Sequence, residues 1–232
     1  MATASARNGA GTRPGYVRRF TATERVLHWT HATAFFALLA TGLVLYVPSL
    51  SIWVSRRDVV KNIHIWVAVA WFVALVFVVA LGNRRALRET WQEIETIDRD
   101  DRRWLTGRRA RQGRFNASQK VNAILTAAFA LVFVVSGFFL WLGERDHRFL
   151  LDGAVVVHDT AMYGSLVLLT GHLYLAVLHP TTRHALRGMT YGDVREDWAE
   201  LHHAKWAAAV REDAVEAPPV TRAPRPGTIR AR

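Results

Sequence analysis

The chain has 232 residues, of which 51% are hydrophobic, and a formal net charge of +11. It contains no cysteine, which excludes disulfides, thiolate metal sites, iron–sulfur clusters and covalently attached c-type haem. The hydrophobic residues gather in four blocks, each long enough to cross a bilayer, which takes about 20 residues. The sequence therefore predicts an all-α fold, an integral membrane four-helix bundle.

Residues 1–16 have no apolar core, and we expect a disordered tail there. The first transmembrane helix should end at Pro48, because proline cannot continue a helix. One membrane domain is expected over residues 17–206, followed by a mostly disordered C-terminal tail over 207–232. The four transmembrane helices are expected at about 26–47, 63–82, 121–142 and 154–179.

The connections between the blocks differ in length. Residues 48–62 and 143–153 are short, whereas residues 83–120 are long and polar. Within the long connection, the sequence WQEIETIDRDDRRWL predicts one amphipathic surface helix. Its apolar side chains should face the membrane: Trp91, Ile94, Ile97 and Trp104. After the fourth block, Asp193–Glu212 predicts another surface helix.

Lysine and arginine counts predict the orientation. The N-terminal tail has 5, the long connection 11 and the C-terminal tail 9, against 3 and 2 in the two short connections. Cytoplasmic segments carry the excess of these residues. Both termini are therefore expected in the cytoplasm, and the basic charge is expected to face anionic lipid headgroups rather than nucleic acid.

Two histidines lie on the fourth predicted helix, His158 and His172. A helix turns by 100° and rises 1.5 Å per residue, so both imidazoles look out of nearly one face, about 21 Å apart along the axis. Ionisable groups inside a membrane are costly and usually functional. For this pair alone, ligation of two cofactors and plain hydrogen bonding to neighbouring helices remain equal alternatives.

The direction of each helix gives its histidines a depth. His28 and His172 lie near the inner face, and His64 and His158 lie near the outer face. Axial ligation of a b-type haem takes two neutral imidazoles at one level on different helices. Pairing His28 with His172 and His64 with His158 is the assignment that gives two such levels. We therefore expect two haems b, with these four histidines as axial ligands of the iron.

The other notable residues have simpler interpretations. His31 has no partner left at its level and should pack against another helix, and His179 should be solvated. His202 and His203 are neighbours that point about 100° apart on a helix, so they should not share a metal. Small residues either admit a flat macrocycle or serve ordinary helix packing: Ala37, Ala40, Gly42, Gly137, Gly164 and Gly171.

Five segments of the chain are distinctive: ERVLHWTHATAFFALLATGLVL, NIHIWV, GRFNASQKVN, HDTAMYGSLVLLTGHLYLA and REDWAELHHAKW. The more specific features within them are the N-A-x-Q-K run and the W-x-x-x-H-H-x-x-W tail. Together these segments resemble the gamma subunit of membrane-bound formate dehydrogenase, a di-haem cytochrome b related more distantly to the b-type cytochromes of nickel–iron hydrogenases. The resemblance covers about residues 16–206, in the same order.

The resemblance implies the same four haem ligands and a quinone pocket beside the inner haem. That pocket is built from His172 and an N-A-G-Q run, which here reads Asn116, Ala117, Ser118 and Gln119. Ser118 replaces the usual glycine, and Asp159 stands beside His158 where an apolar residue is usual. Asn116 and Gln119 can donate to a quinone oxygen through their amides, or Asn116 can cap the third helix.

The resemblance also implies a function. The subunit lies in the bacterial cytoplasmic (inner) membrane, and electrons enter it from an iron–sulfur beta subunit. They pass from the outer to the inner haem and reduce menaquinone or ubiquinone near the cytoplasmic face. Formate is oxidised by a molybdenum or tungsten catalytic alpha subunit, not by this chain. The alternatives are the cytochrome b of a hydrogenase or another molybdoenzyme and, in a different class, a haem-free membrane anchor.

Overall fold

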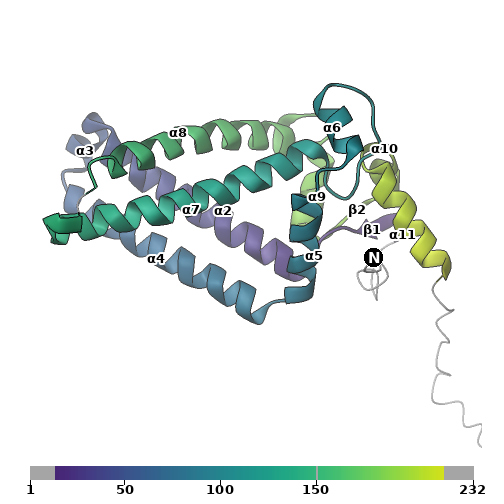
Figure 1. Ribbon diagram of the computed structural model, residues 1–232, viewed down its shortest axis with the longest axis horizontal. Coiled ribbons are helices and arrows are strands. Elements are labelled where there is room, and N and C mark those ends of the chain that lie inside the picture. Colours follow the sequence, from purple (N-terminus) through teal and green to yellow (C-terminus); the bar gives the residue numbers. More distant parts are fainter. Residues whose placement is uncertain (1–13, 150, 217–232) are drawn as a thin grey trace, which may run out of the picture.

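The computed structural model describes residues 14–149 and 151–216. Within them, four long apolar segments are able to cross a membrane and run along one another (Figure 1). The predicted four-helix membrane bundle is confirmed. The segments are α2 (Ala22–Tyr46), α4 (Arg57–Leu81), α7 (Ala117–Arg145) and α8 (Ala154–Leu173), the last continued by the π-helical η2 (Tyr174–Leu178).

The first connection contains a helix that the sequence did not predict. Helix α2 ends at Tyr46, close to the expected stop, but Pro48 then opens α3 (Pro48–Val54). Proline is favoured in the first turn of a helix because the N–H that it lacks has no partner there. Pro48 therefore separates two helices rather than beginning a loop.

The long helices pack in sequential pairs, α2 against α4 and α7 against α8. Gly164 of α8 shows how closely the second pair approaches. A Cβ atom at this position would lie 2.6 Å from Cζ of Phe129 on α7. Gly164 therefore serves helix packing, one of the two roles considered for the small residues.

One end of the bundle carries a cap of short elements, on the right in Figure 1. Strands β1 (Tyr16–Arg18) and β2 (Asp193–Arg195) pair antiparallel in it, with Val17 opposite Val194. Its helices are α5 (Arg84–Glu95), α6 (Arg99–Leu105), η3 (Arg183–Ala185), α9 (Leu186–Thr190), α10 (Glu196–His202) and α11 (Ala204–Glu216). The described parts of the three basic segments thus meet at this end, while α3 and η1 (His147–Phe149) lie at the other.

The prediction of one surface helix over residues 91–105 is wrong. The chain breaks between α5 and α6, where Asp98 caps α6 and forms a reciprocal capping box with Asp101. Ile94 is buried, so it faces the protein and not the membrane, whereas Trp91 and Trp104 stay exposed. An N-cap carboxylate that satisfies free N–H groups starts a new helix even where the apolar periodicity continues.

The prediction of one helix over Asp193–Glu212 is also wrong. Residues 193–195 form strand β2, and a break at His203 separates α10 from α11. Helix α11 runs to Glu216, beyond residue 207 where the disordered tail was expected to begin, and Tyr16, expected in the N-terminal tail, starts β1. The rest of the two predicted tails, residues 1–13 and 217–232, lies outside the described residues.

Candidate functional site

Two pairs of histidines face each other inside the bundle. The ring centroids of His28 on α2 and His172 on α8 lie 6.2 Å apart. Those of His64 on α4 and His158 on α8 lie 6.4 Å apart. Two imidazoles on opposite sides of one metal ion place their ring centres about 6 Å apart, from a metal–nitrogen bond of about 2 Å and a nitrogen-to-centre distance of about 1 Å. The structure thus brings the four predicted ligands together in the predicted pairs, at the spacing of axial ligands.

A hydroxyl group orients His64. Oγ1 of Thr41 lies 2.8 Å from Nδ1 of His64 and also 2.8 Å from the carbonyl oxygen of Ala37. The carbonyl can only accept, so the hydroxyl donates to it and accepts from the Nδ1–H. This tautomer leaves Nε2 of His64 with a free lone pair, which is the state that ligates a metal.

His158 is held in the same way by Ser136. Oγ of Ser136 lies 2.9 Å from Nδ1 of His158 and donates to the carbonyl oxygen of Val132 over 2.6 Å. Nε2 of His158 is again left as the free nitrogen. The donor set of the outer pair therefore fits a bis-histidine iron.

The two hydroxyl residues belong to a repeated pattern that the sequence reasoning missed. Thr41-Gly42 precedes His64, and Ser136-Gly137 precedes His158; each histidine follows its hydroxyl residue by 23 and 22 positions, respectively. A Cβ on either glycine would lie 3.5 Å from Cε1 of the same histidine. The repeat of a hydroxyl–glycine pair at a nearly constant distance was the signal that could have revealed them.

The inner pair lies toward the capped end, where α2 begins and α8 ends. The His28 ring meets Trp29 edge-on, with a centroid distance of 5.3 Å. The π-helical segment η2 starts two residues after His172, and such segments occur frequently at functional sites. His31 packs against Trp71, with ring centroids 5.7 Å apart, in agreement with the packing role expected for it.

The predicted quinone run Asn116–Gln119 forms the start of α7. Oδ1 of Asn116 accepts from the N–H of Gln119 and from the hydroxyl of Ser118, both over 2.9 Å, while Oε1 of Gln119 accepts from the N–H of Asn116 over 3.1 Å. Ala117 is fully buried. The capping role considered for Asn116 is therefore present. The side-chain NH₂ groups of Asn116 and Gln119 donate to none of the described residues and remain free to bind a ligand.

A buried ionic cluster holds the chain just before this run. Arg114 donates to Glu24 and to Glu93, both over 2.7 Å, and to Oγ1 of Thr90 over 2.7 Å. Its Nη1 also donates to the carbonyl oxygen of Arg19 over 3.2 Å. Arg114 and Glu24 are 4% and 6% exposed. This ion cluster links the residue after β1, helices α2 and α5, and the chain just before α7.

Lys120, the last residue of the N-A-x-Q-K run, forms a second buried ionic contact in addition to that of Arg114. Its Nζ donates to Oδ2 of Asp101 over 2.6 Å and to the carbonyl oxygen of Thr96 over 2.9 Å. The lysine thereby ties the first turn of α7 to α6 and to the break before it. Its role in this structure is to fix the position of the run.

The histidines of the C-terminal tail have structural partners. His203 is 1% exposed, and its Nδ1 donates to the carbonyl oxygen of Gly113 over 2.7 Å. Burial, and then the charge of Arg19, lower the pKa of His203 to about 2, so it stays neutral. The His202 ring stacks on Trp198 at 5.0 Å. In the described part of the chain, no group of three or more potential ligands suits a metal ion.

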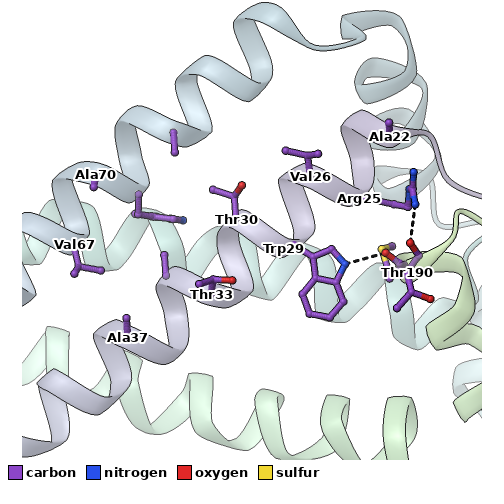
Figure 2. A pocket seen from close by; sticks show the side chains of 14 residues that line it. Ala22, Arg25, Val26, Trp29, Thr30, Thr33, Ala37, Val67, Ala70 and Thr190 are labelled. Atoms are coloured by element: carbon purple, nitrogen blue, oxygen red, sulfur yellow. Dashed lines mark hydrogen bonds between the residues drawn. The ribbon is translucent and has the colours of Figure 1, made fainter.

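A groove of about 740 Å³ runs between α2 and α4 (Figure 2). Trp29 Nε1 donates to the carbonyl oxygen of Met189, and Arg25 Nη1 donates to that of Thr190. These bonds attach α2 to α9. The remaining wall is largely small or apolar, so the groove offers an apolar slot with few groups to orient a polar ligand.

Comparison with known proteins covers most of the chain. A family model described as prokaryotic cytochrome b561 matches residues 19–192. The formate dehydrogenase cytochrome b556(fdo) subunit of Escherichia coli (strain K12) is 25% identical over 209 residues, which are 84% of this chain and 93% of that protein.

A second relative agrees with the first. The nitrate-inducible formate dehydrogenase cytochrome b556(Fdn) subunit of the same strain is 24% identical over 196 residues, 79% of this chain and 86% of the relative. A subunit with the same description from Shigella flexneri gives the same values. These relatives confirm the resemblance seen in the sequence, and the family match spans both histidine pairs.

Proposed function

Because this chain belongs to the prokaryotic cytochrome b561 family, a family of b-type cytochromes, we propose that it is the membrane cytochrome b subunit of a formate dehydrogenase complex. The complex passes electrons from an iron–sulfur subunit, fed by a molybdenum or tungsten catalytic subunit, to menaquinone or ubiquinone. The relatives are named as formate dehydrogenase subunits, which supports formate dehydrogenase as the source of the electrons.

The observation that carries the proposal is the presence of two histidine pairs at axial-ligand spacing. His28 with His172 and His64 with His158 would each hold one haem b, which when bound carries one electron at a time between its ferric and ferrous states. The Thr41 and Ser136 hydroxyls accept from Nδ1–H and so orient the outer imidazoles with Nε2 toward the position where the iron would bind. The inner pair, near the cap, would hold the haem that passes electrons to the quinone.

An absorption spectrum separates this proposal from its alternatives. Purified protein reduced with dithionite should show the alpha band of b-type haem, and the pyridine haemochrome assay should give two haems per chain. A haem-free anchor would show no band. The catalytic subunits that copurify with the chain distinguish a formate dehydrogenase from a hydrogenase or another molybdoenzyme.

We expect the capped end to face the cytoplasm of the bacterial inner membrane. The described parts of the three basic segments gathered there carry 3, 11 and 5 lysines and arginines, and such an excess marks the cytoplasmic side. An alkaline phosphatase domain, active only outside the cytoplasm, should therefore be inactive when fused at the C-terminus and active when inserted within residues 143–153. The opposite pattern would place the quinone side on the outer surface.

We expect Gln119→Leu to keep both haems but to slow quinone reduction about tenfold or more, because the variant loses an amide donor at the proposed quinone site. The measurement is the rate at which the reduced, desalted cytochrome is re-oxidised by decylubiquinone. A purely capping role predicts lower stability, by roughly 1 kcal/mol, with normal re-oxidation. Normal re-oxidation in both Asn116→Leu and Gln119→Leu would move the quinone site elsewhere.

A further inference from the structure

The side-chain amide of Gln119 has a fixed orientation in this structure. Its Oε1 accepts from the N–H of Asn116 over 3.1 Å and from Nη2 of Arg19 over 3.2 Å. Both neighbours are donors without any acceptor capacity at these atoms, so the amide atom between them has to be the oxygen. The Nε2 amide hydrogens consequently point away from Asn116 and Arg19.

Arg19 is itself immobilised. It is 1% exposed, and its Nη2 also donates to the carbonyl oxygen of Arg114 over 2.7 Å. Its guanidinium lies over the rings of Phe20 and Trp198, at 5.1 Å and 5.4 Å from their centroids. Its backbone N–H donates to the carbonyl oxygen of Gly192 over 2.8 Å, beside the β1–β2 pair.

Burial, and then the charge of Arg114, lower the pKa of Arg19 to about 9. Arg19 therefore remains charged at neutral pH. A charged guanidinium can only donate hydrogen bonds. It consequently holds the Gln119 amide in one of its two possible orientations.

We propose that Arg19 is a positioning residue for the quinone: by binding Oε1 of Gln119, it presents the Nε2–H of this amide as a donor to the quinone carbonyl oxygen. The inference rests on the quinone site proposed above. Both carbonyl oxygens of a quinone are hydrogen-bond acceptors. An amide turned the other way would place its own oxygen against the quinone oxygen and could not donate to it. Fixing the orientation in advance removes the cost of selecting it on binding.

The test is a double-mutant cycle of Arg19→Met and Gln119→Leu. For Arg19→Met we expect both haems to be retained, the half-saturating decylubiquinone concentration for re-oxidation to rise about fivefold, as for the loss of one ordering hydrogen bond, and the maximal rate to change less than about twofold. The dissociation constant of a hydroxyquinoline N-oxide inhibitor, measured by its fluorescence quenching, should rise by the same factor. In the Gln119→Leu background, Arg19→Met should have no further effect, because Arg19 acts through Gln119.

Arg18→Met is the matched control. Arg18, the last residue of β1, directly precedes Arg19 and is half-buried, so the variant removes an equal charge from the adjacent position. For Arg18→Met we expect the half-saturating decylubiquinone concentration to remain that of the wild type. Arg19→Lys, which keeps a charged donor, should show a smaller rise than Arg19→Met.

Gln119→Glu tests the orientation without altering Arg19. A carboxylate retains both hydrogen bonds to Asn116 and Arg19 but presents an oxygen to the quinone, so the variant should fold with both haems and raise the half-saturating decylubiquinone concentration at least tenfold. Wild-type half-saturation in Gln119→Glu would overturn the inference, even if Arg19→Met failed to assemble. Additive effects in the cycle, or normal half-saturation in Arg19→Met, would also overturn it.

The outcomes separate this inference from the proposed function. Normal quinone turnover in Gln119→Leu removes the quinone site, and the role of Arg19 with it. Impaired turnover in Gln119→Leu combined with normal behaviour of Arg19→Met and Gln119→Glu removes the role of Arg19 alone.

Discussion

His158→Ala should remove one of the two proposed haems, because the variant loses one of the two imidazoles that would hold it, the one that Ser136 keeps in the ligating tautomer. The pyridine haemochrome content should fall from two haems per chain to one, or to none where the bundle no longer assembles. A His64→Ala variant should lose the same spectral component. Retention of two haems in either variant would refute the assignment.

The inner pair gives the complementary result. His28→Ala and His172→Ala should lose the other spectral component, since their rings face each other and not the outer pair. His31→Ala is the matched control, one turn from His28 on the same helix but packed against Trp71. It should retain both haems, and the loss of one would mean that the inner ligand has been misassigned.

Arg114→Met should produce the largest loss of stability in the cap. Glu24, whose side chain is 4% exposed, would lose its charged partner, and removing one member of a buried ion pair typically costs about 3–5 kcal/mol. The thermal unfolding midpoint in detergent should fall accordingly. A second substitution, Glu24→Gln, should restore part of the loss, because the unpaired carboxylate is then gone.

Arg148→Met is the control for a surface pair. Arg148 bonds Asp146 over 2.9 Å, but its side chain is 87% exposed. Exposed pairs contribute about 0–1 kcal/mol, so its midpoint should hardly move. Equal midpoints for Arg114→Met and Arg148→Met would show that the ion cluster does not stabilise the cap.

The long helices were predictable because membrane solvation demands about 20 apolar residues in succession. The shorter helices beside them were less predictable from the sequence. The periodicity over residues 91–105 continues across a break that Asp98 creates by capping α6, and Pro48 was interpreted as a stop although it begins α3. Local hydrogen bonding decided both cases, and apolar periodicity does not record it.

The histidine pairs followed from the sequence because topology assigns each imidazole a depth, and the structure brings the same pairs together. The roles of Thr41 and Ser136 did not follow from the sequence, because threonine and serine are ordinary residues of membrane helices. The contact between Arg114 and Glu24 joins positions 90 residues apart. No periodic pattern connects such distant residues, so only the folded chain reveals them.

Helix α8 carries one histidine of each pair, His158 and His172. The separation of the two histidine levels is therefore set by the rise of one α-helix, at about 21 Å for 14 residues, and not by how helices from different parts of the chain pack. In the proposed di-haem arrangement, this one helix would fix the distance on which the rate of electron tunnelling between the haems depends. The other two ligands, on α2 and α4, can adjust to α8 without altering that length.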